Sequence, residues 1–174
     1  MSLIWWLLPA VVVFWAVGAY NRLVRLRGLA LQAFDALHMA LVRQSELLQS
    51  ALPAEAQPEP PEGDAWRTLR AALVQFNALL VATRTRGLDP DAIGALVAAR
   101  TVLGEAWSRA SAQSPGTAAD AVSVRWDELV REAGTAIAQF DTSVARYNEA
   151  VRGFPAVILA WLFALRPARP FESR

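Results

Sequence analysis

The sequence predicts an all-α protein in which an N-terminal transmembrane helix continues into an antiparallel four-helix bundle with long helices. Three observations favour this fold. The first 21 residues carry no charged side chain, apolar residues recur at helical spacing through most of the remaining chain, and two loop-forming segments divide it. A strand-rich fold is not expected, because the apolar residues do not alternate with a period of two.

Residues 1–21 have the length and composition of a membrane anchor. A helix rises ~1.5 Å per residue, so this uncharged run reaches about 30 Å, the thickness of a hydrocarbon core. The aromatic residues expected to anchor it are Trp5, Trp6, Trp15 and Tyr20. A cleaved secretory signal and a buried helix of a soluble core are the alternatives. The first lacks a basic residue before the run, and the second is disfavoured because the run is apolar on every face.

Arginines indicate the orientation of this anchor. Arg22, Arg25 and Arg27 follow the uncharged run, and no basic side chain precedes it. Basic residues next to a membrane span stay on the cytoplasmic side. We therefore expect a single-pass protein whose N-terminus lies outside the membrane and whose body is cytoplasmic.

The body is expected to be helical over residues 22–153. The first helix continues from the anchor and ends at Pro53. Residues 53–64 are predicted to be a linker, because they contain four prolines and four acidic residues. A second helix is expected over residues 65–86, with Gly87 in the position that follows a helix C-terminus.

The second half of the body contains two more predicted helices. Asp89 has the side chain of a helix cap and Pro90 suits the first helical position. Residues 111–119 are predicted to be a loop, and the fourth helix follows it to Gly153. Apolar residues recur along this last helix in alternating steps of four and three, which predicts a packing seam. The predicted seam residues are Trp126, Val130, Ile137, Phe140, Val144, Tyr147 and Val151.

Residues 154–174 form a short apolar segment with a basic tail. The uncharged run at its start, residues 154–165, has twelve residues and is too short to cross a bilayer alone. The segment has three possible placements: on the membrane surface, within the bundle, or between subunits. The residues suited to a membrane surface are Trp161, Phe163, Arg166 and Arg169.

Motifs near both ends of the body resemble the LemA family of bacterial membrane-anchored helical proteins. The matching residues are Tyr20, Asn21, Leu23, Val24, Tyr147, Asn148, Phe154 and Pro155. The chain departs from the family at Gln49, where the family has a proline, so it looks like a divergent member. The resemblance implies a helical body on an anchor in the bacterial inner membrane. It implies no catalytic activity and no set of functional residues.

The two Tyr-Asn pairs have a physical reading of their own. A tyrosine ring can pack while its hydroxyl needs a partner, and an asparagine amide can satisfy polar groups of another helix. If the first and last helices are antiparallel, both pairs lie near the membrane end. We expect them to meet there; ordinary interfacial tyrosines with exposed asparagines are the alternative.

The composition excludes several kinds of chemistry. The chain has no cysteine, its 17 basic residues are all arginine, and its formal net charge is +1. Thiol chemistry, Schiff-base chemistry and bulk-charge binding of nucleic acid are therefore not expected. His38 is the single histidine, and no second histidine or acidic cluster completes a metal shell. We expect no catalytic site, no metal and no cofactor.

These observations favour a membrane-anchored scaffold that is not an enzyme. Such a protein self-associates or recruits a protein partner at the bilayer, and an assembly of rigid rods could organise or remodel the membrane. The alternative is a regulatory module that binds lipid or another small apolar ligand between its helices. The apolar segment at the C-terminal end motivates this second hypothesis.

Overall fold

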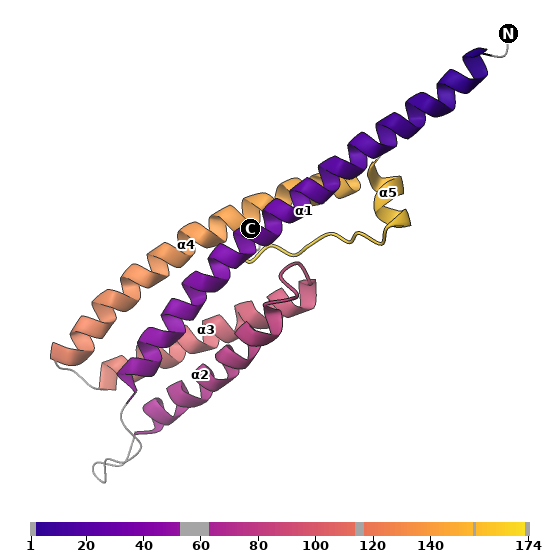
Figure 1. Cartoon of the computed structure of the whole chain (residues 1–174). Helices are drawn as coiled ribbons and strands as arrows, with labels where there is room; N and C mark the ends of the chain where they lie inside the picture. Colours follow the sequence, from indigo (N-terminus) through magenta and orange to yellow (C-terminus); the bar gives the residue numbers. More distant parts are fainter. Residues whose placement is uncertain (1–2, 53–62, 114–116, 155, 173–174) are drawn as a thin grey trace.

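The computed structural model describes residues 3–52, 63–113, 117–154 and 156–172, with side chains for 11–52, 63–113, 120–154 and 157–172. The described residues form five helices and no strand. This confirms the predicted helical fold (Figure 1). The helices are α1 (Leu3–Ala51), α2 (Asp64–Thr83), α3 (Pro90–Gln113), α4 (Thr117–Arg152) and α5 (Ala156–Leu162).

The four long helices pack as two antiparallel pairs. α1 packs mainly against α4, and α2 packs mainly against α3, whereas α3 and α4 touch at few points. Figure 1 shows α1 extending past the other long helices at its N-terminal end, with α5 beside it where α4 stops. The bundle therefore has one end from which a single helix protrudes.

α1 is one helix through the uncharged run and the first part of the body. Its inward stripe is fully buried at Leu23, Ala30, Phe34, Leu37, Leu41 and Leu48. Each large side chain on such a stripe contributes about 1.5–3 kcal/mol by burial. The predicted linker, residues 53–64, lies outside the described residues except for its last two, Gly63 and Asp64, where α2 begins.

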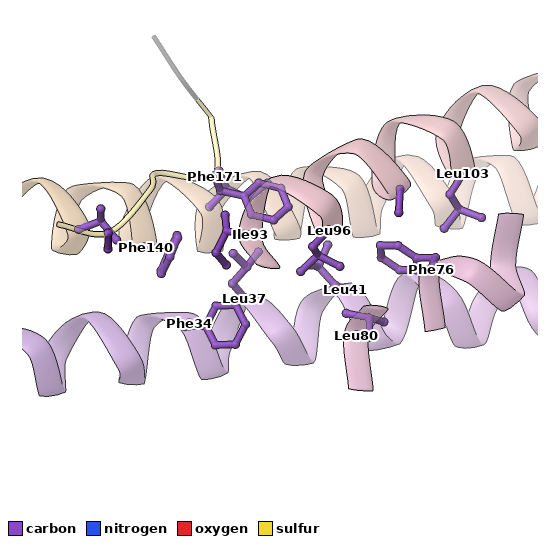
Figure 2. Packing of buried hydrophobic residues seen from close by; sticks show 14 of the residues in the cluster. Phe34, Leu37, Leu41, Phe76, Leu80, Ile93, Leu96, Leu103, Phe140 and Phe171 are labelled. Atoms are coloured by element: carbon purple, nitrogen blue, oxygen red, sulfur yellow. The ribbon is translucent and has the colours of Figure 1, made fainter. Parts of the chain in front are cut away.

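The core is shared by all four long helices. Phe34, Leu37 and Leu41 of α1 face residues from α2, α3 and α4 (Figure 2). The ring of Phe34 lies 5.8 Å from the ring of Phe140, centroid to centroid. At the end of the bundle remote from α5, three tryptophans form a chain of ring contacts at 6.4 Å. These are Trp66, Trp107 and Trp126.

The seam of α4 faces α1 along most of its length. Five of its predicted residues are buried: Ile137, Phe140, Val144, Tyr147 and Val151. Trp126 and Val130 are half-buried. α4 ends at Arg152, so the next seam position, Phe154, leaves the seam and is exposed.

Two polar contacts fix the register between α1 and α4. The buried amide of Gln44 donates a 3.0 Å hydrogen bond to the Leu129 carbonyl, and Arg43 forms an ion pair with Glu132. If α1 slid along α4, the buried amide of Gln44 would lose its hydrogen-bond partner, at a cost of about 1–3 kcal/mol. Sliding of the two helices is therefore disfavoured.

The turn between α2 and α3 differs from the sequence-based expectation. α2 ends at Thr83, three residues before the expected end, and Gly87 does not adopt a positive φ. A Cβ atom on Gly87 would lie 2.6 Å from Cγ of Phe34, so glycine is required for close packing. Asp89 does cap α3: its Oδ1 accepts hydrogen bonds from the backbone N–H groups of Asp91 (2.9 Å) and Ala92 (3.3 Å).

The connection between α3 and α4 is shorter than the predicted loop over residues 111–119. α3 continues to Gln113 and α4 begins at Thr117, so helix covers most of this stretch. Residues 114–116 lie outside the described residues.

Candidate membrane interface

The protruding end of α1 exposes large apolar side chains on all of its faces. Val11, Val12, Val13, Phe14 and Val17 are all exposed, and Phe14 reaches 86%. Trp15 is 47% exposed and Tyr20 38%. The side chains of Trp5 and Trp6, predicted to anchor the outer end, lie outside the described residues. Contiguous apolar exposure of this kind marks an interaction surface.

α5 adds a second apolar element at the same end of the molecule. It buries Ala160 but exposes Ile158, Trp161 and Leu162, with Trp161 at 83%. Only a narrow face of α5 packs within the bundle. The exposed side chains remain open to the other two expected placements, on a membrane surface or between subunits. Pro155, which precedes α5, lies outside the described residues.

A tight C-terminal cap ends α5 and reverses the chain. Leu165 N–H donates to the Ala160 carbonyl at 2.8 Å, and Ala164 N–H donates to the Trp161 carbonyl at 3.3 Å. This is the Schellman pattern, which places the residue after the helix in the left-handed region. That residue is Ala164, with φ at 52°, where a Cβ atom costs about 1–2 kcal/mol.

Aromatic contacts hold α5 against α1. The ring centroids of Tyr20 and Phe163 lie 4.9 Å apart, and those of Trp15 and Phe154 lie 6.1 Å apart. Tilted aromatic pairs at these distances contribute about 0.5–1.5 kcal/mol beyond their buried area. The two apolar elements are therefore joined at two points, one on each side of α5.

Beyond α5, residues 165–172 form an extended C-terminal strap that runs back along the bundle (Figure 1). Tyr147 Oη donates to the Arg166 carbonyl at 3.1 Å. Asn148 makes two 2.7 Å hydrogen bonds with the backbone of Ala168, one as donor and one as acceptor. Asp141 accepts from the backbone N–H groups of Phe171 (2.5 Å) and Glu172 (3.0 Å).

Side chains of the strap fill the space between α4 and α3. Phe171 is buried, and the guanidinium of Arg100 on α3 lies 6.0 Å from its ring centroid. Burial lowers the pKa of Arg100, and the nearby Glu172 carboxylate opposes this shift. Arg169 lies against Gly94 of α3. The strap therefore carries Arg169 away from the apolar end, while Arg166 stays exposed nearer to α5.

Within the described residues, no hydrogen bond or ring contact joins the two Tyr-Asn pairs, which we expected to meet. Instead, Tyr20, Tyr147 and Asn148 contact the C-terminal segment, and Asn21 is exposed. Tyr20 packs on Phe163, whereas Tyr147 and Asn148 hold the strap. Burial raises the pKa of Tyr147, and the positive charge of Arg27 works against that shift. The contact between the second Tyr-Asn pair and the strap is not predicted in the sequence analysis above. A signal was present, because Asp141 and Asn148 are seven residues apart and so lie on one face of α4.

A belt of arginines borders the apolar end. Arg22, Arg25 and Arg27 are exposed where α1 enters the bundle. Within the described part of the chain, none of the three takes part in an ion pair. Unpaired guanidinium groups next to an apolar surface match the phosphate layer of a membrane.

The described residues contain no group of three or more histidine or acidic side chains that could hold a metal ion. His38 lies near the ring of Phe34, and its buried Nδ1 has no hydrogen-bond partner among the described residues. Burial lowers the pKa of His38, the Arg84 charge lowers it further, and Asp35 opposes both. This environment is that of a structural histidine.

Over the part of the chain that the structure describes, no helix qualifies as long and apolar enough to cross a membrane. No family model, curated protein or solved structure matches the chain. The fold and the surface define a helical bundle with an apolar end.

Proposed function

We propose that the protein is a non-enzymatic helical scaffold anchored in a membrane by its apolar end, and that it is a divergent member of the LemA family. One observation carries the membrane part of this proposal. The exposed apolar side chains of α1 and α5 gather at one end of the bundle, next to unpaired arginines. The family proposal rests on the Tyr-Asn and Phe-Pro motifs.

The energy of this surface supports attachment to lipid. Removing one large apolar side chain from water contributes about 1.5–3 kcal/mol. Several such side chains act together here, because α1 is one continuous helix and α5 is fastened to it by two aromatic contacts. Residues 1–21 carry no charged side chain, and we place the proposed anchor in this run as a single pass.

The arginines set the proposed orientation. Arg22, Arg25 and Arg27 lie at the body side of the apolar run, and basic residues stay cytoplasmic. We place the body in the cytoplasm of a bacterial cell and the N-terminus on the other side of the inner membrane.

The scaffold part of the proposal concerns the sides of the bundle. Val74 and Val81 on α2 and Val124 on α4 are more than half exposed on the sides of the bundle. These positions offer contacts for a second copy of the chain or for a protein partner. A rigid α1 would then transmit the arrangement of the bodies to the bilayer.

The test is reconstitution of the full chain into vesicles, followed by carbonate extraction and flotation. We expect the chain to remain with the vesicles, and mass photometry of nanodiscs to show more than one copy per particle. Val13→Arg, in the middle of the uncharged run, should weaken vesicle retention of the chain, whereas Val81→Arg, at an exposed position on α2, should not. A chain released by carbonate would contradict the anchor. Single copies, with no partner crosslinked in native membranes, would contradict the scaffold.

A further inference from the structure

A cavity of about 430 Å³ lies between α1 and α4 at the apolar end. Small residues on both helices create it: Gly18 and Ala19 on α1, and Ala150 and Gly153 at the end of α4. Their short side chains leave space that the larger neighbours on each helix do not fill. The volume falls in the range of ~300–1,000 Å³ typical of sites for small organic ligands.

The two ends of the cavity differ in chemistry. Trp15 and Phe154, whose rings are in contact, line the end nearer the tip of α1. Arg22 and Glu149 line the end nearer the bundle. The seven residues from Trp15 to Arg22 span ~10 Å of helix. The cavity is therefore apolar toward the proposed bilayer and charged toward the proposed headgroup layer.

We infer that this cavity binds one acyl chain of a glycerophospholipid whose headgroup carries both a phosphate and a primary ammonium group. This inference rests on the proposed function, because the bilayer supplies the lipid. The exposed apolar side chains of α1 and α5 are continuous with the cavity wall at Trp15 and Phe154, so a lipid acyl chain can enter the cavity from the side. Its methylene groups then replace water against an apolar lining.

The charges at the inner end select the headgroup. Neither Arg22 nor Glu149 forms an ion pair with any residue in the described ranges. A guanidinium binds a phosphate through two parallel hydrogen bonds, and a carboxylate accepts hydrogen bonds from a primary ammonium. A headgroup with a phosphate alone would bring a like charge to Glu149, which disfavours it. A quaternary ammonium has no N–H to donate.

Glycine positions on α1 provide a matched pair of variants. Gly18 lines the cavity, and a Cβ atom there meets nothing within 4 Å, so the larger side chain of Gly18→Leu is expected to occupy part of the cavity. Gly28 lies on the same helix, also meets nothing within 4 Å, and is not part of the lining. Gly28→Leu therefore gives the same gain in helix propensity and leaves the cavity open.

The experiment uses the full chain in vesicles of equal parts phosphatidylethanolamine, phosphatidylcholine and phosphatidylglycerol. After extraction in mild detergent, native mass spectrometry counts the lipids retained per chain. We expect one retained phospholipid, enriched in phosphatidylethanolamine. Gly18→Leu should lower its occupancy about tenfold, and Gly28→Leu should leave it unchanged. Glu149→Gln should abolish the preference for phosphatidylethanolamine, and Arg22→Gln should lower retention of all three lipids.

Two results would overturn the inference: a wild-type chain that retains no lipid, or Gly18→Leu retaining as much as wild type. Equal retention of the three headgroups by the wild-type chain would overturn the headgroup assignment. Flotation of the same vesicles separates this inference from the proposed function. A chain that floats but retains no lipid keeps its anchor and loses the lipid site. A chain that does not float loses both.

Discussion

The contact between Gly87 and Phe34 gives the sharpest prediction about stability. Gly87 is buried in the turn that leads into α3, directly against the ring of Phe34. In Gly87→Ala the new methyl group would lie 2.6 Å from Cγ and 2.9 Å from Cε1 of that ring. Neither atom can move easily, because Phe34 is 1% exposed and its ring also packs against Phe140.

The size of the effect follows from overpacking. Inserting a methyl group into a filled core costs about 1–3 kcal/mol. In a chain of this length each kcal/mol lowers the melting temperature by about 2–4 °C. We therefore expect Gly87→Ala to melt about 2–12 °C below wild type, measured by circular dichroism at 222 nm in one detergent.

Two further variants test the cause of this loss. Gly104→Ala in α3, where a Cβ atom meets nothing within 4 Å, should be stabilised by about 0.5–1 kcal/mol through helix propensity. Phe34→Leu replaces the ring that the methyl group meets with a smaller side chain. The double variant of Gly87→Ala and Phe34→Leu should therefore lose less stability than the sum of the two single losses. Gly87→Ala melting at or above wild type, or strictly additive losses in the double variant, would refute the packing argument.

Three other predictions concern the strap, the histidine and the cap of α5. Asp141→Ala and Asn148→Ala should each cost about 1–3 kcal/mol and speed hydrogen exchange across residues 165–172, because backbone partners are lost; unchanged exchange would contradict this. His38 has a folded pKa below its ordinary value of 6.5, so the unfolded chain binds its proton more readily. The stability that neutral His38 contributes to the folded state is therefore fully present above pH 6.5 and is lost as the pH falls through the lowered pKa. In thermal melts at several pH values, His38→Gln should not show this loss of stability at low pH. Ala164→Gly should stabilise the chain by about 1 kcal/mol in thermal melts, since glycine adopts a positive φ without strain; a loss would argue against the cap.

The parts of the fold that depend on repeating local patterns could be predicted from the sequence. The steps of four and three along α4 locate its buried face, and the stripe from Leu23 to Leu48 indicates that α1 continues past the uncharged run. Asp89 followed by Pro90 predicts the start of α3, because a cap and a first-turn proline act within a few residues.

The features that the sequence did not reveal depend on contacts between distant residues. Gly87 fits a local rule for helix ends, yet its neighbour is Phe34, which is more than fifty residues away. The strap has no periodic pattern of its own, and its hydrogen bonds come from side chains of α4. The cavity at Gly18 requires α1 and α4 to meet in one register, which no local signal specifies.

The location of the apolar end relative to a bilayer can be measured directly. The chain has no cysteine, so single cysteines introduced by Val13→Cys, Trp161→Cys, Val81→Cys and Val124→Cys can each carry one spin label. In reconstituted vesicles we predict that labels at positions 13 and 161 relax rapidly with oxygen and are shielded from a water-soluble nickel chelate. Labels at 81 and 124, on the sides of the bundle, should behave oppositely. Equal access of the chelate to all four positions would contradict a membrane interface formed by α1 and α5.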